Sequence, residues 1–305
     1  MSVETYIDAQ ERMLTRFGVQ AESRFVDVPL LDGRAHVLVV GNGPPVVMVV
    51  GGGAPAAMWA PLMAELADFT LYAVDLPGMG LTDPVRYTTR TLRSVGVDFL
   101  DQILDRLGLD RPVLVAQSMG GLWSTWLALD KPDRVPAISF IGCPALMLGS
   151  SAPFPIRLGS IPPIGRLLMR LQPPSLELVD RIAVMAGENF TDQPELRELF
   201  LAHQQLPTPK RALLELHHAA VRLRGARPKV ALTKRQLSEL EQPVQLIWGA
   251  NDTFGPPAVG GRAAEIIPTA ELHVVPGGHG PWVNQPKRVA AIVAPFLETH
   301  SAGST

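Results

Sequence analysis

A short apolar run that ends at a serine constrains the fold of this chain more than any other segment. The residues are Val113-Leu114-Val115-Ala116-Gln117-Ser118-Met119-Gly120-Gly121. Small residues, Ala116 and Gly120, stand two positions before and two positions after Ser118. A strand that turns sharply into a helix needs small residues at both places, because the two backbones crowd them. The run therefore predicts a buried strand, a tight turn that presents Ser118, and a helix.

Other apolar runs predict further strands of the same kind. They cover residues 46–50, 71–74, 137–141, 244–248 and 272–275, and several of them precede helix-like segments. Short strands that are apolar throughout are typical of a parallel sheet with helices on both faces. Earlier in the chain, turn sequences rich in glycine separate short β segments. We therefore predict an α/β fold with a mostly parallel central sheet covered by helices.

The alternation of strand and helix stops between residues 143 and 242. This stretch holds helix-period segments at 164–171, 176–186, 194–206 and 210–223, separated by prolines, and it predicts no strand. We expect residues 1–142 and 243–305 to form the core and residues 143–242 to form an inserted helical lid. Long insertions often serve active sites. A purely structural extension is the alternative.

The apolar residues of the expected lid bear on what it covers. Leu167-Leu168-Met169, Val184-Met185 and Phe190 are candidates for lining an apolar pocket. Packing of the same residues onto the core is the alternative, since apolar helix faces usually belong to a core. The polar tail, residues 299–305, is expected to fray.

Charge and cysteine content limit the partners and the compartment. The chain has 27 basic and 29 acidic residues, a net charge of −2 and a single cysteine, Cys143. It has no basic stripe to follow a phosphate backbone, so we expect no nucleic-acid partner. The first residues lack a secretory signal, and no apolar run approaches the roughly 20 residues needed to span a bilayer. We expect a cytoplasmic protein with a small-molecule substrate and no membrane span, in an oligomeric state that the sequence leaves open.

A serine hydroxyl becomes a strong nucleophile when a histidine takes its proton and an acid orients that histidine. His279 lies in the glycine-rich stretch Gly277-Gly278-His279-Gly280, directly after an apolar run, and Asp252 follows another predicted strand. The order Ser, Asp, His is the one expected with this strand–turn–helix motif, the nucleophile elbow. Ser118, Asp252 and His279 are therefore candidate catalytic residues. For Asp252 alone, a turn residue is the alternative.

Attack on a carbonyl places negative charge on its oxygen, which preorganised N–H donors stabilise. The backbone N–H of Met119 is one candidate donor, and Gly52 or Gly53, after the strand at 46–50, is the second. A nucleotide-binding loop would continue with Lys-Ser/Thr, whereas Ala56-Ala57-Met58-Trp59 follows here. His217 and His218 are adjacent on a predicted helix and cannot form an i, i+4 metal pair. We therefore expect neither a cofactor nor a metal.

These features together resemble the α/β-hydrolase superfamily, in its serine-nucleophile branch with a helical lid. The resemblance runs from about Ser23 to Leu297, and Asp75-Leu76-Pro77-Gly78-Met79-Gly80 and Trp248-Gly249-Ala250-Asn251-Asp252 strengthen it. It implies a structural role for Asp75. It also implies hydrolysis of a small, largely apolar carboxylic ester, thioester or lactone through an acyl-enzyme formed on Ser118.

The chain departs from the family pattern in two places. The family usually has a histidine just before the first oxyanion-loop glycine, and this chain has Val50 or, in the neighbouring register, Gly51. The glycine run also resembles carbon–carbon bond hydrolases of vinylogous diketones, which place an aromatic residue directly after the histidine. Here Gly280 follows, and Trp282 comes later. A carbon–carbon bond hydrolase is thus one alternative, and a ligand-binding or non-hydrolytic member of the same fold is another.

Overall fold

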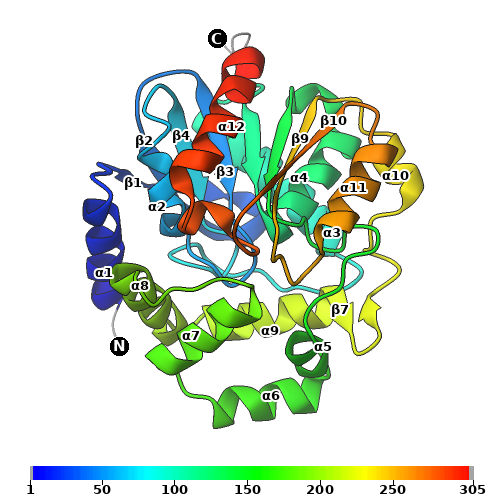
Figure 1. Cartoon of the computed structure of the whole chain (residues 1–305). Coiled ribbons are helices and arrows are strands. Elements are labelled where there is room, and N and C mark those ends of the chain that lie inside the picture. The colour runs from blue at the N-terminus through cyan, green and yellow to red at the C-terminus, as the bar shows by residue number, and fades with distance from the viewer. Residues whose placement is uncertain (1–2, 302–305) are drawn as a thin grey trace.

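A computed structural model of the chain describes residues 3–301 (Figure 1). Its centre is an eight-stranded sheet with the strand order β1-β2-β4-β3-β5-β6-β9-β10. β2 is antiparallel to both of its neighbours, and every other pairing between adjacent strands is parallel. The predicted α/β fold with a mostly parallel sheet is confirmed. The strands are β1 (Glu22–Val28), β2 (Gly33–Val40), β3 (Pro45–Val49), β4 (Thr70–Val74), β5 (Val113–Ala116), β6 (Ile138–Ile141), β9 (Val244–Gly249) and β10 (Ala270–Val275).

Helices cover both faces of this sheet. They are α3 (Leu92–Leu107), α4 (Ser118–Asp130) and α11 (Pro257–Ile266) on one face, and α2 (Ala60–Met63) and α12 (Pro286–Ser301) on the other. Val47 and Val49 of β3 pack with the first group, whereas Val46 and Met48 pack with the second. Alternate side chains of a strand point to opposite faces, so a strand between two helical layers is apolar throughout. This explains why unbroken apolar runs predicted the strands.

The β6–β9 segment, residues 142–243, consists mainly of helices. α6, α7, α8 and α9 match the four helical segments that the sequence predicts, whereas two short helices and a pair of two-residue strands were not predicted. In Figure 1 helices α5 to α9 of this segment gather below the sheet, whereas α10 lies beside α11. The elements are α5 (Phe154–Gly159), α6 (Pro162–Leu171), α7 (Leu176–Met185), α8 (Pro194–Gln205), α9 (Pro209–Ala220), β7 (Val221–Arg222), β8 (Gly225–Ala226) and α10 (Lys234–Ser238).

Helix α9 lies against the loop that follows β3. A Cβ atom built on Gly52 would lie 2.7 Å from Cδ2 of Leu216, and one built on Gly53 would lie 3.1 Å from Cδ1 of Leu213. In open α/β sheets, ligands bind beyond the carboxyl ends of the strands. The β6–β9 segment therefore covers the edge of the sheet at which Ser118 follows β5.

Two terminal features differ from the sequence analysis. Helix α1 (Val3–Arg16) was not predicted, although its buried residues Tyr6, Ala9 and Met13 recur at helical spacing. It is held to α8 by an ion pair between Arg12 Nη2 and Glu198 Oε2, 3.1 Å apart. The predicted fraying is wrong for residues 299–301, which end α12, and residues 302–305 lie outside the described part. Within residues 3–301, no helix is long and apolar enough to cross a membrane.

The buried His203 predicts a pH-dependent stability. Its Nε2 accepts the N–H of Gly80 at 3.0 Å, so α8 is tied to the loop after β4 through a neutral imidazole. Burial lowers the pKa of His203 from 6.5 to about 4. Between about pH 6.5 and pH 4, His203 is protonated in the unfolded chain but stays neutral in the folded chain. The free energy of unfolding therefore falls as the pH is lowered through this range. We expect this residue to account for about 3 kcal/mol of loss between pH 7 and pH 4.

Denaturant unfolding at several pH values, on the wild type and on His203→Gln, measures this contribution. A glutamine oxygen can still accept the N–H of Gly80, but the side chain does not titrate. The variant is expected to lose less stability than the wild type on acidification, by the amount given above. Parallel stability–pH curves for the two proteins would contradict the prediction.

Candidate active site

Ser118 lies at the sharp turn between β5 and α4. Its φ of 51° is in the left-handed region, which side chains other than glycine rarely adopt, so the surrounding structure enforces this conformation. A Cβ atom on Gly120 would lie 2.2 Å from the carbonyl oxygen of Val49, which explains the small residue after the turn. Before the turn, Ala116 is paired with Val49 on one side and Phe140 on the other, and all three pack in the same core cluster on one face of the sheet. The sequence prediction of strand, turn and helix is confirmed.

His279 and Asp252 meet beyond the carboxyl ends of β9 and β10, which are adjacent parallel strands. The Nδ1 atom of His279 lies 2.9 Å from Oδ2 and 3.1 Å from Oδ1 of Asp252. Both side chains are buried. A carboxylate only accepts, so Nδ1 carries the proton in this arrangement and Nε2 presents a lone pair. The pairing of these two candidates is therefore present in the structure.

The Asp252 carboxylate is also held by the backbone. Its Oδ2 accepts the N–H of Cys143 at 2.8 Å and its Oδ1 accepts the N–H of Phe254 at 2.9 Å. Burial acts to raise the pKa of Asp252, but the charge and hydrogen bond of His279 and the two backbone donors outweigh it and hold the pKa below its ordinary value. Asp252 is therefore ionised at neutral pH and can orient the imidazole.

The other ring nitrogen of His279 has no hydrogen-bond partner within residues 3–301. Nε2 is buried and makes no hydrogen bond among the described residues, so no bond joins it to Ser118 in this structure. Gln117, the residue before Ser118, links the two regions by donating from Nε2 to the backbone oxygen of His279 at 3.1 Å. Phe254 stacks on the imidazole with ring centroids 4.0 Å apart. A buried imidazole lone pair without a partner is an available proton acceptor.

The loop after β3 lies beside the serine. A Cβ atom on Gly51 would lie 2.9 Å from Cβ of Ser118, and one on Gly52 would lie 3.7 Å from Cβ of Met119. Gly53 has a φ of 86°, which glycine adopts freely. The structure thus brings the predicted oxyanion candidates, Gly52, Gly53 and Met119, to one place. It does so without the family's histidine.

A second Ser–His–Asp array forms a hydrogen bond with the end of this loop. Ser23 Oγ lies 2.7 Å from Nε2 of His36, whose Nδ1 lies 2.7 Å from Oδ2 of Asp75. Asp75 also accepts the N–H of Ala56, at the end of the glycine loop, at 2.6 Å. Ser23 sits in the regular β1–β2 ladder, not at a strand–helix turn. The array anchors Asp75, and the structural role that the resemblance implied for this residue agrees with its contacts.

The residues proposed to line an apolar pocket divide in the structure. Leu167 and Val184 have exposed fractions of 55% and 71%, so for these two residues both the pocket-lining role and the alternative of packing onto the core are wrong. They sit on outward faces of amphipathic helices. Phe190 is buried and packs on Phe200, with ring centroids 5.7 Å apart. The apolar residues that do lie over the glycine loop, Leu213 and Leu216, were not singled out by the sequence.

Glu188 is the residue at this site that sequence reasoning missed. It follows α7 and its carboxylate accepts the backbone N–H groups of Gly278 and Gly280, the two neighbours of His279, at 2.7 and 3.0 Å. No motif surrounds it, because its partners are backbone groups about ninety residues further along the chain. The same absence of local pattern hid the contacts of Gln117 and Phe254.

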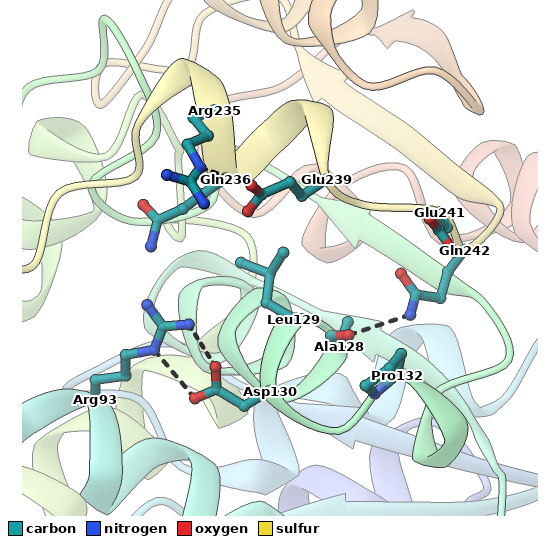
Figure 2. A pocket seen from close by; sticks show the side chains of 10 residues that line it. All are labelled: Arg93, Ala128, Leu129, Asp130, Pro132, Arg235, Gln236, Glu239, Glu241 and Gln242. Atoms are coloured by element: carbon teal, nitrogen blue, oxygen red, sulfur yellow. Dashed lines mark hydrogen bonds and ion pairs between the residues drawn. The ribbon is translucent and has the colours of Figure 1, made fainter.

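A cavity of about 560 Å³ lies elsewhere, at the far end of α4 (Figure 2). Asp130 at its wall is twelve residues from Ser118, which is about 18 Å along a helix. Four of its charged side chains form two ion pairs: Arg93 Nη2 with Asp130 Oδ1 at 2.6 Å, and Arg235 Nε with Glu239 Oε1 at 2.7 Å. This cavity is not part of the candidate site. Within residues 3–301, no group of three His, Cys, Asp or Glu side chains is arranged to hold a metal ion.

Known proteins match this chain over most of its length. A model of the alpha/beta hydrolase family matches residues 46–292. A pimeloyl-[acyl-carrier protein] methyl ester esterase of Shewanella oneidensis is 26% identical over 274 residues, which cover 86% of this chain and 94% of that protein. A 2-hydroxy-6-oxononadienedioate/2-hydroxy-6-oxononatrienedioate hydrolase of Burkholderia vietnamiensis is 30% identical over 292 residues, which cover 91% of this chain and 96% of that protein.

Solved structures show the same fold. Carboxylesterase CesB from Bacillus subtilis superposes with a TM-score of 0.79 at 21% sequence identity, covering 99% of both chains. A 2-hydroxy-6-oxo-6-phenylhexa-2,4-dienoate hydrolase from a Rhodococcus strain superposes with a TM-score of 0.73 at 22% identity, covering 92% of this chain and 99% of that one. The chain therefore belongs to the alpha/beta hydrolase family and is a hydrolase.

Proposed function

We propose that this protein is a serine hydrolase that cleaves a small, largely apolar carboxylic ester, thioester or lactone through an acyl-enzyme. The observation that carries the proposal is the His279–Asp252 pair, whose buried Nε2 has no hydrogen-bond partner among the described residues. Ser118 stands on a strained elbow, and the residue before it, Gln117, bonds the backbone of His279. Ser118 Oγ attacks the substrate carbonyl carbon while Nε2 of His279 takes its proton. The imidazolium then protonates the leaving group, and water releases the acyl group by the reverse sequence.

The remaining site residues have roles in the same reaction. Asp252 fixes the tautomer of His279 and stabilises the imidazolium. The N–H groups of Met119 and of Gly52 or Gly53 stabilise the oxyanion, a contribution of about 10²-fold to 10³-fold per donor. What supports their assignment is the closeness of the glycine loop to Ser118 and Met119.

The β6–β9 segment serves as the lid in this proposal, with residues 143–242 as the lid and residues 1–142 and 243–305 as the hydrolase core. α9 supports this role, because Leu213 and Leu216 lie directly over Gly53 and Gly52. Their side chains favour an apolar substrate group next to the oxyanion donors. We further propose a cytoplasmic location, because a single cysteine fits a reducing compartment. The balance of charge favours a small-molecule substrate rather than nucleic acid.

A carbon–carbon bond hydrolase of a vinylogous diketone is the second candidate, and the Burkholderia relative favours it. The aromatic residue nearest to His279 in sequence on its C-terminal side argues for the ester instead. Trp282 is fully buried, donates from Nε1 to the backbone oxygen of Met58 at 3.0 Å, and stacks on Trp59. Its ring is committed to the core and Gly280 offers no side chain, so an aromatic contact to a diketone at this position is missing.

Turnover of a substrate panel decides between the candidates. We expect p-nitrophenyl esters of short and medium acyl chains, an acyl thioester and a lactone to be hydrolysed with a kcat/KM at least tenfold above that of a dienoic diketone. A preference for the diketone would replace the ester assignment with carbon–carbon bond cleavage. Saturable ligand binding with no turnover of any substrate, unchanged by Ser118→Ala, would show a ligand-binding member of the fold.

A further inference from the structure

Glu188, which follows the end of α7, forms hydrogen bonds with the loop that carries His279. Oε1 of Glu188 accepts the N–H groups of both neighbours of His279, Gly278 at 2.7 Å and Gly280 at 3.0 Å. Oε2 accepts Nδ2 of Asn284, just beyond the same loop, at 2.9 Å. Because one carboxylate bonds the residues before and after the imidazole, the position of the ring depends on the position of Glu188.

Backbone oxygens just before Glu188 also accept hydrogen bonds from the loops of His279 and Asp252. The N–H of His279 itself donates to the backbone oxygen of Ala186 at 2.8 Å. Thr253, the residue after Asp252, donates from Oγ1 to the backbone oxygen of Met185 at 2.5 Å. A Cβ atom on Gly278 would lie 2.4 Å from the Ala186 oxygen, so the two segments are in backbone contact. Residues 185–188 therefore hold both the acid loop and the base loop.

Glu188 also acts on His279 through its charge. Burial raises the pKa of Glu188, whereas the two backbone N–H donors, Asn284 and the positive charge of a protonated His279 lower it. The last interaction is an attraction between opposite charges, so the Glu188 carboxylate lies close enough to act on a positive charge that forms on the His279 ring. Asp252 acts on the same ring at Nδ1, and the buried thiol of Cys143, whose pKa burial raises, lies next to Asp252. His279 thus has two carboxylates acting on it, of which only Asp252 bonds its ring.

We propose that Glu188 is a positioning residue of the hydrolytic reaction, which fixes the His279 loop to the β6–β9 segment and stabilises the imidazolium that forms when Ser118 gives up its proton. This inference rests on the proposed function. It couples the base, His279, to the lid, because a displacement of α7 would move both acceptors of the loop together: the Glu188 carboxylate, which bonds Gly278 and Gly280, and the Ala186 oxygen, which bonds His279. Burying a carboxylate costs free energy of desolvation, and attraction to the imidazolium would offset part of that cost.

The substitution Glu188→Gln tests the inference. An amide oxygen can still accept the N–H groups of Gly278 and Gly280, but the charge is lost. We expect kcat for ester hydrolysis to fall about tenfold with KM within about twofold, and the acidic limb of the kcat/KM–pH profile to move to lower pH. Glu177→Gln, on the exposed side of the same helix α7, is the matched control and should leave kcat, KM and the profile unchanged.

A milder variant keeps the inference testable if Glu188→Gln does not fold. Asn284 is exposed, and Asn284→Ala removes one restraint on Glu188 while leaving its charge. We expect a fall in kcat of about twofold to fivefold with the acidic limb in place. A folded Glu188→Gln with wild-type kcat and pH profile, or an Asn284→Ala variant with wild-type kcat, would overturn the inference.

The rate at which a fluorophosphonate labels Ser118 separates the two proposals. If the folded wild type is not labelled, the proposed function fails. If the wild type is labelled and Glu188→Gln is labelled at the same rate across the acidic limb, only the role of Glu188 fails. Slower labelling of Glu188→Gln, with unchanged labelling of Glu177→Gln, supports both.

Discussion

Replacing Ser118 with alanine is expected to lower kcat for ester hydrolysis by about 10⁴-fold or more while leaving the fold intact. The substitution removes the oxygen that forms the acyl-enzyme, and neither Gln117 nor Met119 can replace it. Alanine keeps the Cβ atom, which lies beside the glycine loop, so the packing of the turn against that loop should not change. Steady-state kinetics on the best ester of the panel, with thermal unfolding as the check on folding, measures the effect.

The chain supplies its own matched control for this substitution. Ser23 also belongs to a Ser–His–Asp array, with both hydrogen bonds at 2.7 Å. It stands in a regular strand pair without the helix N-terminus and glycine loop that Ser118 has. Ser23→Ala should therefore retain ester hydrolysis within about twofold. Loss of activity in Ser23→Ala with retention in Ser118→Ala would reverse the assignment of the nucleophile.

Asp252→Asn is expected to lower kcat by about 10³-fold to 10⁴-fold. An asparagine amide can donate to Nδ1 of His279, which moves the ring proton to Nε2, the atom that must accept the proton of Ser118. The side-chain oxygen of asparagine can still accept the N–H of Cys143 or of Phe254, so we expect the loop to keep its shape. kcat and the pH profile of kcat/KM, measured on a variant shown to be folded by circular dichroism, test the expectation.

The alternative reading of Asp252 as a turn residue makes a different prediction for the same variant. A residue that only shapes the turn after β9 would tolerate asparagine, which turns also favour. In that case kcat would fall by less than about tenfold, in step with any loss of stability. A folded Asp252→Asn variant with nearly full activity would therefore remove Asp252 from the catalytic residues.

The sheet could be predicted from the sequence because its strands are buried on both faces. Val46 and Val113, for example, belong to unbroken apolar runs. Such runs are typical of strands whose side chains are buried on both faces of a parallel sheet. Helix α1 shows the limit of this reasoning. Its apolar residues lie on one face of the helix, but nothing in the local sequence indicates that α1 packs against α8. Glu198 of α8, which pairs with Arg12 of α1, is 186 residues further along the chain. Packing between segments so distant in the chain is not encoded in either one alone.

The candidate site divides in the same way. Ser118, His279 and Asp252 could be found because each follows a strand end and is surrounded by glycine or other turn residues, a local signal. The partners that hold them could not. Glu188 acts on backbone N–H groups, which every residue possesses, so the sequence around Gly278 and Gly280 does not indicate which carboxylate binds there. The same holds for Leu213 and Leu216, whose place over the glycine loop follows from the packing of α9.

Intact mass after treatment with a fluorophosphonate is the measurement to make first on the proposed nucleophile. We expect one adduct on the wild type and on Ser23→Ala, none on Ser118→Ala, and slow labelling of Asp252→Asn, because the proposed mechanism gives Ser118 an activating base and oxyanion donors. An unlabelled but folded wild type, or an adduct that persists in Ser118→Ala, would contradict it.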